Sequence, residues 1–150
     1  MSVNPTVQLL QDLLRNARTG QEAVEELLPM VEDRDMRSEL ARERGLYQAA
    51  RREAEQALDA AGGEPEPTGL LARAGMWLGL QANTFTDRSS AHIAEIVIQG
   101  ATMGSIEMTK SKNTYAEAEP GALGLASRFI VQQSEIVERQ KAFLKDVVHA

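Results

Sequence analysis

Apolar residues recur every three or four positions along most of this chain, the spacing of one face of an α-helix. In the first segment only Gln21 interrupts this row, which comprises Val7, Leu10, Leu14, Ala17, Val24, Leu28 and Val31. A second row widens the face beyond the seam of a two-stranded coiled coil and comprises Leu9, Leu13, Ala23 and Leu27. We therefore expect this segment to pack against several helices.

Helix-breaking residues divide the chain into a few segments. Proline, glycine and short polar runs occur near the N-terminus, after Pro29, and around 62–69, 86–90 and 119–124. The intervening segments are rich in Ala, Leu, Glu, Arg and Gln, which favour helix, and strand patterns are nearly absent. The sequence predicts a shorter helix near 69–83 and four long helices at about 5–31, 35–61, 88–114 and 121–148.

Four amphipathic helices with short polar connections predict an all-α four-helix bundle that forms one domain over residues 1–150. The segment near 69–83 differs because it holds the only tryptophan, Trp77, with Gly75 and Gly79, and no charge occurs at 76–85. We expect it to cap the core across one end of the bundle; an exposed docking patch is the alternative.

Composition narrows the class of protein. The chain has no cysteine, which excludes thiolate catalysis and cysteine-ligated metal. Its formal net charge of −6 argues against a nucleic-acid partner. No apolar run approaches the roughly 20 residues that span a bilayer, and the first residues lack the pattern of a signal peptide. A cytoplasmic location is therefore expected.

Some polar residues fall inside the apolar arcs when each helix is advanced by about 100° per residue. Buried polar groups need a partner, water or a ligand, so these positions are the candidates for chemistry. They are Gln21 in the first helix, Glu43 and Tyr47 in the second, Glu107 in the helix at 88–114, and Gln133 and Gln140 in the last.

The order of two long helices, a Gly/Pro linker, the motif TGLLARAGMWLGL and two more long helices resembles the ferritin-like superfamily, in particular its small bacterial proteins of unknown function. The resemblance implies a bundle of up-down helix pairs with a short crossing helix between the second and third long helices. Metal-binding members also use Glu-x-x-His motifs. Here Leu46 follows Glu43 at that spacing and Lys110 follows Glu107, so a standard di-iron centre is not expected.

Two main interpretations of Glu43 and Glu107 remain. In the favoured one they belong to an inward polar network with Tyr47, Gln133, Gln140 or an arginine, which gives fold specificity. In the other they supply oxygen ligands to a divalent cation such as Mg²⁺, Mn²⁺ or Ca²⁺. A general acid–base pair is a third and weaker reading.

The helix at 88–114 carries three further features. His92 and Glu95 could suggest a metal-binding pair, but they lie toward its polar face, as a surface pair behind a cap at Ser89 or Ser90. Gly100 and Gly104 form a small-residue strip that predicts a closely crossing helix, within the bundle or in a dimer. The methionines, including Met76, Met103 and Met108, are interpreted as core filler.

No serine, lysine or threonine is arranged with a base as a nucleophile, and no glycine-rich phosphate loop follows a strand. The sequence therefore favours a non-catalytic helical-bundle protein without a cofactor, which self-associates as a homo-oligomer or binds a protein partner. A metal-binding protein with a carboxylate-rich site that lacks histidine ligands is the alternative.

Overall fold

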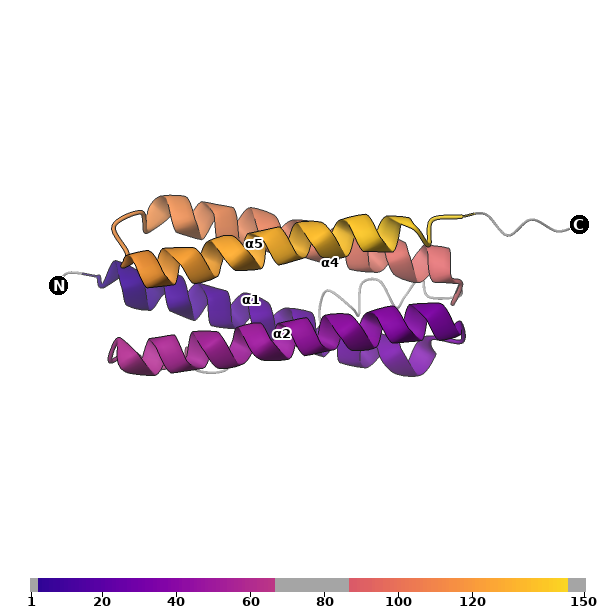
Figure 1. Cartoon of the computed structure of the whole chain (residues 1–150), viewed down its shortest axis with the longest axis horizontal. Helices are drawn as coiled ribbons and strands as arrows, with labels where there is room; N and C mark the ends of the chain where they lie inside the picture. Colours follow the sequence, from indigo (N-terminus) through magenta and orange to yellow (C-terminus); the bar gives the residue numbers. More distant parts are fainter. Residues whose placement is uncertain (1–2, 67–86, 146–150) are drawn as a thin grey trace, which may run out of the picture.

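The computed structural model describes residues 3–66 and 87–145, and these form a bundle of four helices (Figure 1). The helices are α1 (Pro5–Leu27), α2 (Arg34–Ala60), α4 (Ser90–Thr114) and α5 (Pro120–Lys141), with the 3-10 turn η1 (Leu28–Met30) after α1. The described ranges contain no strand, so the all-α prediction is confirmed. None of these helices is both long enough and apolar enough to cross a membrane.

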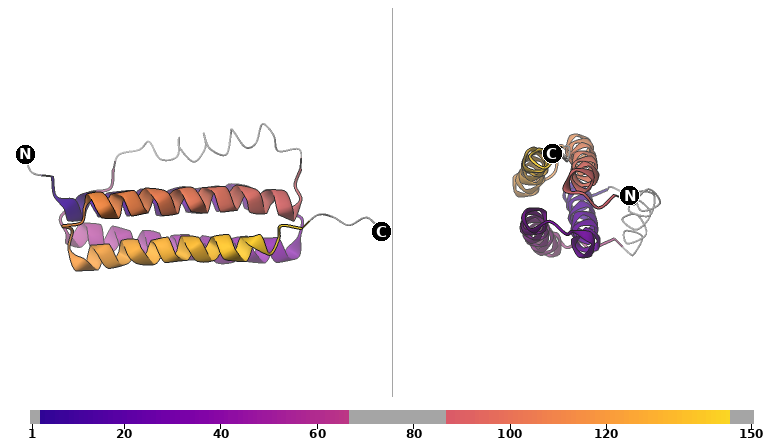
Figure 2. Two further views of the ribbon diagram at one scale, coloured as in Figure 1. Left: turned by 90° about the horizontal axis from the view of Figure 1, so that it is seen from above. Right: turned by 90° about the vertical axis from the view of Figure 1, so that its right-hand side faces the viewer.

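The helices form two antiparallel hairpins that pack side by side. α1 pairs with α2, and α4 pairs with α5, and the end-on view places the four helices at the corners of a square (Figure 2). α1 neighbours α4, and α2 neighbours α5. α2 and α4 point in the same direction, so Ala60 and Ser90 lie at opposite ends of the bundle (Figure 1). This arrangement creates two seams between the hairpins, α1–α4 and α2–α5.

Short polar side chains fix where the helices begin. The side chain of Asn4 accepts hydrogen bonds from the backbone N–H groups of the first turn of α1, and Pro5 occupies the first helical position. Asp33 caps α2 in the same way, and Ser89 caps α4, one of the two expected positions. Ser90 Oγ also donates to Asp33 Oδ2 at 2.9 Å, which ties the starts of α2 and α4 together.

Two helix ends differ from the sequence expectation. The first helix was expected to reach 31, but α1 ends at Leu27 and a 3-10 turn follows, because Pro29 has no N–H to continue the hydrogen bonds of the α-helix. The last helix was expected at 121–148, but α5 ends at Lys141 and 142–145 are not helical. Leu144 stays 44% exposed, so a longer helix would gain no packing there. Residues 146–150 lie outside the described part, as does the helix expected near 69–83 with Trp77.

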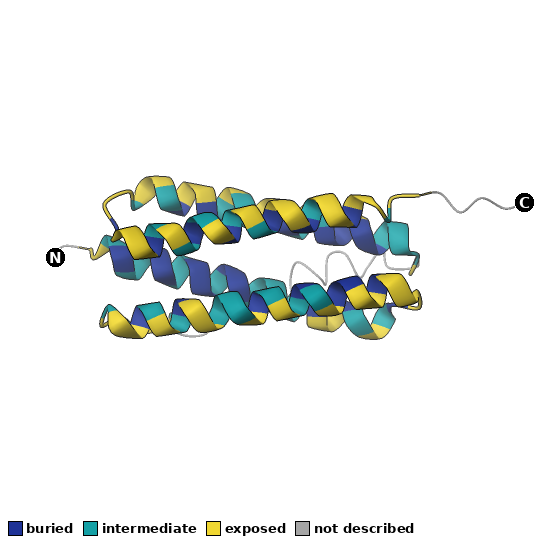
Figure 3. Ribbon diagram, in the orientation of Figure 1, coloured by how far each residue is buried: buried dark blue, intermediate teal, exposed yellow. Residues whose placement is uncertain are grey.

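The core fills the space between the two hairpins. Buried residues face inward on every helix (Figure 3), and both apolar rows of α1 contribute to it. The largest apolar side chains that are fully buried are Leu9, Leu10, Leu13, Leu14, Met36, Leu40, Leu58, Ile93, Ile96, Met108 and Ile136. Met103 was expected among them, but it is 50% exposed, because α4 turns this position toward the rim of the α1–α4 seam.

Candidate functional site

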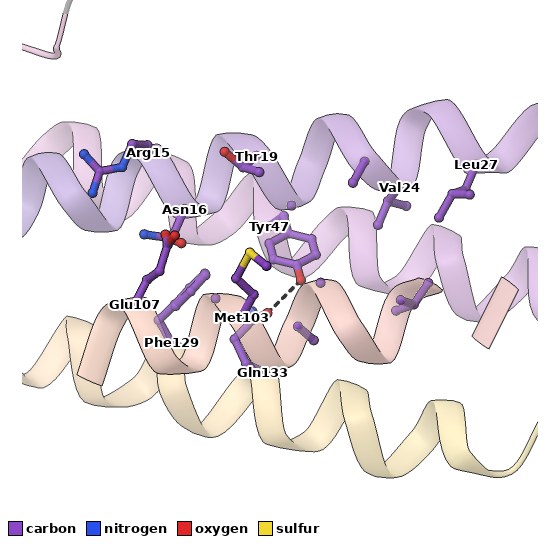
Figure 4. Close-up of a pocket in the computed structure, with 16 residues that line it drawn as sticks. Arg15, Asn16, Thr19, Val24, Leu27, Tyr47, Met103, Glu107, Phe129 and Gln133 are labelled. Carbon is purple, nitrogen blue, oxygen red and sulfur yellow. Dashed lines mark hydrogen bonds between the residues drawn. The ribbon is translucent and has the colours of Figure 1, made fainter. Parts of the chain in front are cut away.

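A groove of about 300 Å³ follows the seam between α1 and α4. Its walls consist mainly of small and apolar residues of these two helices, including Ala23, Val24 and Leu27 of α1 and Val97, Gly100, Ala101 and Gly104 of α4. Tyr47 of α2, and Phe129 and Gln133 of α5, reach the groove from the other helix of each hairpin (Figure 4). All four helices therefore contribute to one site.

The floor of the groove is a paired tyrosine and glutamine. Tyr47 is 6% exposed and its hydroxyl donates to Gln133 Oε1 at 2.9 Å. The Tyr47 ring lies against Gly20 of α1 and at a tilt to Phe129, with ring centroids 6.3 Å apart. A Cβ atom on Gly20 would stand 2.6 Å from Tyr47 Cδ1, and closer to other ring atoms, so only glycine gives the ring this place.

One end of the groove is polar, where Arg15, Asn16 and Glu107 gather, whereas Val24 and Leu27 lie toward the other end (Figure 4). The polar groups from α1 are engaged within the protein. Arg15 forms ion pairs with Asp12 at 3.0 Å and with Glu66 at 3.3 Å. The Asn16 amide donates to the Asp12 carbonyl at 2.9 Å and to Met108 Sδ at 3.4 Å.

These contacts restrict the chemistry that the groove can perform. No histidine is found among its described lining residues, so its hydroxyl groups, on Thr19 and Tyr47, have no imidazole base there. Burial raises the pKa of Tyr47 above its ordinary value, and Glu43 adds to this when it is ionised, so the Tyr47 hydroxyl stays protonated. The groove therefore suits binding of an apolar group better than catalysis.

The α2–α5 seam holds a series of polar contacts that we call the polar ladder. From the bundle end at which α2 starts, it pairs Glu39 with Arg139, Glu43 with Gln140, and Tyr47 with Gln133. The α2 residues are one helical turn apart, so they share one face of the helix. This face points into the seam, where all three side chains are buried.

The two carboxylates of the ladder differ in their electrostatic environment. Burial alone would raise the pKa of Glu39, but hydrogen bonds and charge from Arg42 and Arg139 together lower it. Burial raises the pKa of Glu43 to about 8, because the hydrogen bond from Gln140 does not offset the loss of water and Glu39 adds a like charge. The environment therefore favours the ionised form of Glu39 and the protonated form of Glu43.

Glu43 and Glu107, the metal candidates of the sequence, occupy different seams. Glu43 is fully buried and bonded to Gln140 in the α2–α5 seam. Glu107 is half-buried and lines the α1–α4 groove, to which Glu43 does not contribute. Residues 3–66 and 87–145 contain no group of three or more His, Cys, Asp or Glu side chains that could hold a metal ion. Metal binding by this pair stays a prediction.

The remaining sequence candidates are divided between the seams and the surface. Tyr47, Gln133 and Gln140 lie buried within the polar ladder. Gln21 is half-buried and donates to Glu25 Oε1 on its own helix at 3.0 Å, so it takes no part in the ladder.

The His92 and Glu95 pair lies in the first turns of α4. Its Nδ1 to Oε2 distance is 3.7 Å, and the Glu95 side chain is 60% exposed. Glu95 is exposed as the sequence predicts, whereas the His92 side chain is only 21% exposed and is therefore half-buried. His149, the other histidine of the chain, lies outside the described residues.

Several residues of the two seams were not singled out from the sequence. Glu39 lies one turn before Glu43 on the same face of α2, and this spacing was the available signal. Gly20 and Asn16 carried no such signal, because their roles depend on Tyr47 and Met108, which are distant in sequence. No protein-family model, curated protein or solved structure matches this chain.

Proposed function

We propose that this protein is a non-catalytic helical-bundle protein that self-associates through α4. The observation that carries the proposal is the proximity of two apolar side chains and an apolar groove on this one helix. Met103 and Ile106 are 50% and 52% exposed, and they lie three residues apart on the same face. Met103 also forms part of the groove lining.

Such a surface is complementary to itself. In a twofold dimer, the Met103 and Ile106 side chains of one copy would enter the groove of the other, and the reverse contact would form by symmetry. Gly100 and Gly104 favour this because helices with small residues at the contact can approach closely. An added Cβ at Gly104 would make ordinary contact with Gln133 Oε1 at 3.4 Å, so this glycine faces the floor of the groove.

We also propose a ferritin-like bundle topology. The parallel direction of α2 and α4 supports it, because the connection between them has to join opposite ends of the bundle. A single long connection of this kind is typical of ferritin-like folds.

The self-association proposal is tested by light-scattering mass measurements over a range of concentrations. We expect a dimer mass for the natural chain and a shift toward monomer for Ile106→Lys, because a charge would be buried in the dimer contact. Val131→Lys is the matched control, since Val131 is 56% exposed on α5 and outside the groove. A monomer mass for the natural chain at high concentration overturns the proposal.

The absence of cysteine allows a second measurement. A Gln99→Cys variant places one thiol on the exposed face of α4, one helical turn before Met103, and we expect it to form a disulfide-linked dimer under mild oxidation. Ser134→Cys on α5 should not. If the natural chain is monomeric and a Gly104→Leu change shifts the emission of Trp77, this chain's own residues fill the groove and dimerisation is refuted.

A further inference from the structure

Glu43 and Gln140 form the central contact of the polar ladder, and both are completely buried, with 0% exposure. The Gln140 Nε2 group donates to Glu43 Oε2 at 2.6 Å, a short hydrogen bond. The other oxygen of each side chain, Oε1 in both, is buried without a hydrogen-bond partner. Buried polar atoms are nearly always paired, so two unpaired oxygens on one contacting pair require an explanation.

The charged groups around Glu43 do not explain the two unpaired oxygens. Its leading charged neighbours are Glu39 and Arg42 on α2 and Arg139 on α5, and α1 and α4 contribute none of these. Arg139 Nε donates to Glu39 at 2.6 Å, and Arg42 donates to Glu39 at 3.0 Å. Both guanidinium groups therefore neutralise Glu39, one turn away. An ionised Glu43 would leave a buried negative oxygen with no donor.

A single proton on Glu43 would give both unpaired Oε1 atoms a hydrogen-bond partner. A carboxylic acid and a primary amide can form two hydrogen bonds in one ring, in which the amide N–H donates to the acid carbonyl and the acid O–H donates to the amide carbonyl. With a proton on Glu43 Oε1, Gln140 Oε1 becomes its acceptor. The existing bond between Gln140 Nε2 and Glu43 Oε2 is the other half of this ring.

We propose that Glu43 is a neutral carboxylic acid in the folded protein, that it forms a cyclic pair of hydrogen bonds with Gln140, and that its ionisation opens this link between α2 and α5. Loss of the proton turns the two Oε1 atoms into facing acceptors, which repel each other. The bundle thus contains a pH-sensitive contact between its two hairpins. Because Glu43 is remote from the α4 surface, this inference is independent of self-association.

The test is a carbon-13 NMR titration of the glutamate carboxyl groups in the full chain. We expect one resonance with a midpoint near pH 8, far above the ordinary glutamate value of about 4.3. That resonance should disappear in Glu43→Gln and persist in the control Glu95→Gln, whose side chain is exposed. A Glu43 midpoint in the ordinary range overturns the proposal.

A second measurement follows the amide partner. The Gln140 side-chain N–H signals should be protected from exchange with water below pH 8 and lose protection as the pH rises through the Glu43 midpoint. In Glu43→Gln an amide pair can retain both hydrogen bonds, so protection should no longer show that Glu43 midpoint. If protection in the natural chain is the same at pH 6 and pH 9, ionisation does not open the link and the proposal fails.

Discussion

The contact between Gly20 and Tyr47 leads to a prediction about replacing Gly20 by alanine, for which Gly45 provides the control. Gly20 and Gly45 both lie within helices, α1 and α2, so replacement by alanine removes the same backbone flexibility at each. Nothing lies within 4 Å of a Cβ added at Gly45. At Gly20 the new Cβ would overlap the Tyr47 ring, whose Cδ1 atom would be 2.6 Å away.

The two substitutions should therefore differ in their effects on stability. Alanine is better than glycine in a helix by about 1 kcal/mol, so we expect Gly45→Ala to stabilise the protein by roughly this amount. Gly20→Ala has the same gain, but its methyl group would overlap the buried Tyr47 ring, and such overpacking costs about 1–3 kcal/mol. The Tyr47 ring cannot move away freely because it is buried and its hydroxyl is bonded to Gln133.

Urea denaturation followed by helical circular dichroism measures both free energies of unfolding. The expected difference between the variants is about 1–3 kcal/mol, or about 2–12 °C in Tm for a chain of this size. A double variant with Tyr47→Leu should recover much of the loss, because the smaller side chain leaves room for the new methyl group. If Gly20→Ala is as stabilising as Gly45→Ala, Tyr47 does not pack on Gly20 and the description of the groove floor is wrong.

Other predictions concern the polar ladder, a helix cap and metal. Because the pKa of Glu43 is raised from 4.5 to about 8, its contribution to stability is complete below about pH 4.5 and is lost as the pH rises to about 8. At pH 9 the free energy of unfolding of Glu43→Gln, measured by urea denaturation, should therefore exceed that of the natural chain by up to about 5 kcal/mol. Equal free energies of unfolding would contradict this. Tyr47→Phe leaves Gln133 Oε1 without its donor and should cost about 1–3 kcal/mol. Asn4→Ala should cost about 1 kcal/mol through loss of the α1 cap, seen as a lower Tm. The natural chain and a Glu43→Gln, Glu107→Gln double variant, both purified without chelator, should have equal metal content by elemental analysis, because the two carboxylates lie in different seams. A lower metal content in the variant would support the metal site instead.

The sequence predicted the fold class and the direction of some side chains, because both follow from helical periodicity. The phase of α2 is enough to place Glu43 and Tyr47 inward, and the apolar rows of α1 identify much of the core. Periodicity does not state which helix lies opposite. Gln140 as the partner of Glu43, and the α1–α4 seam as the position of Glu107, depend on how the hairpins pack.

Other differences have local causes. The helical periodicity of α4 places Met103 within its apolar arc. However, α4 contacts its neighbours over a narrower face than this arc, so Met103 lies at the exposed rim of the α1–α4 groove. Gly20 was not recognised because the need for a glycine arises from the Tyr47 ring, which comes from another helix.

The two-hairpin architecture has a consequence for dividing the chain. Most contacts of each helix are with the other member of its own hairpin, and these hairpins occupy separate stretches, 3–66 and 87–145. Two separately expressed fragments, 1–66 and 87–150, would each contain one complete helical pair, and within the described ranges the apolar face of each pair packs on the other pair. Mixing them should restore the bundle, so the protein offers a natural place to build a split reporter whose halves regain their helices on meeting.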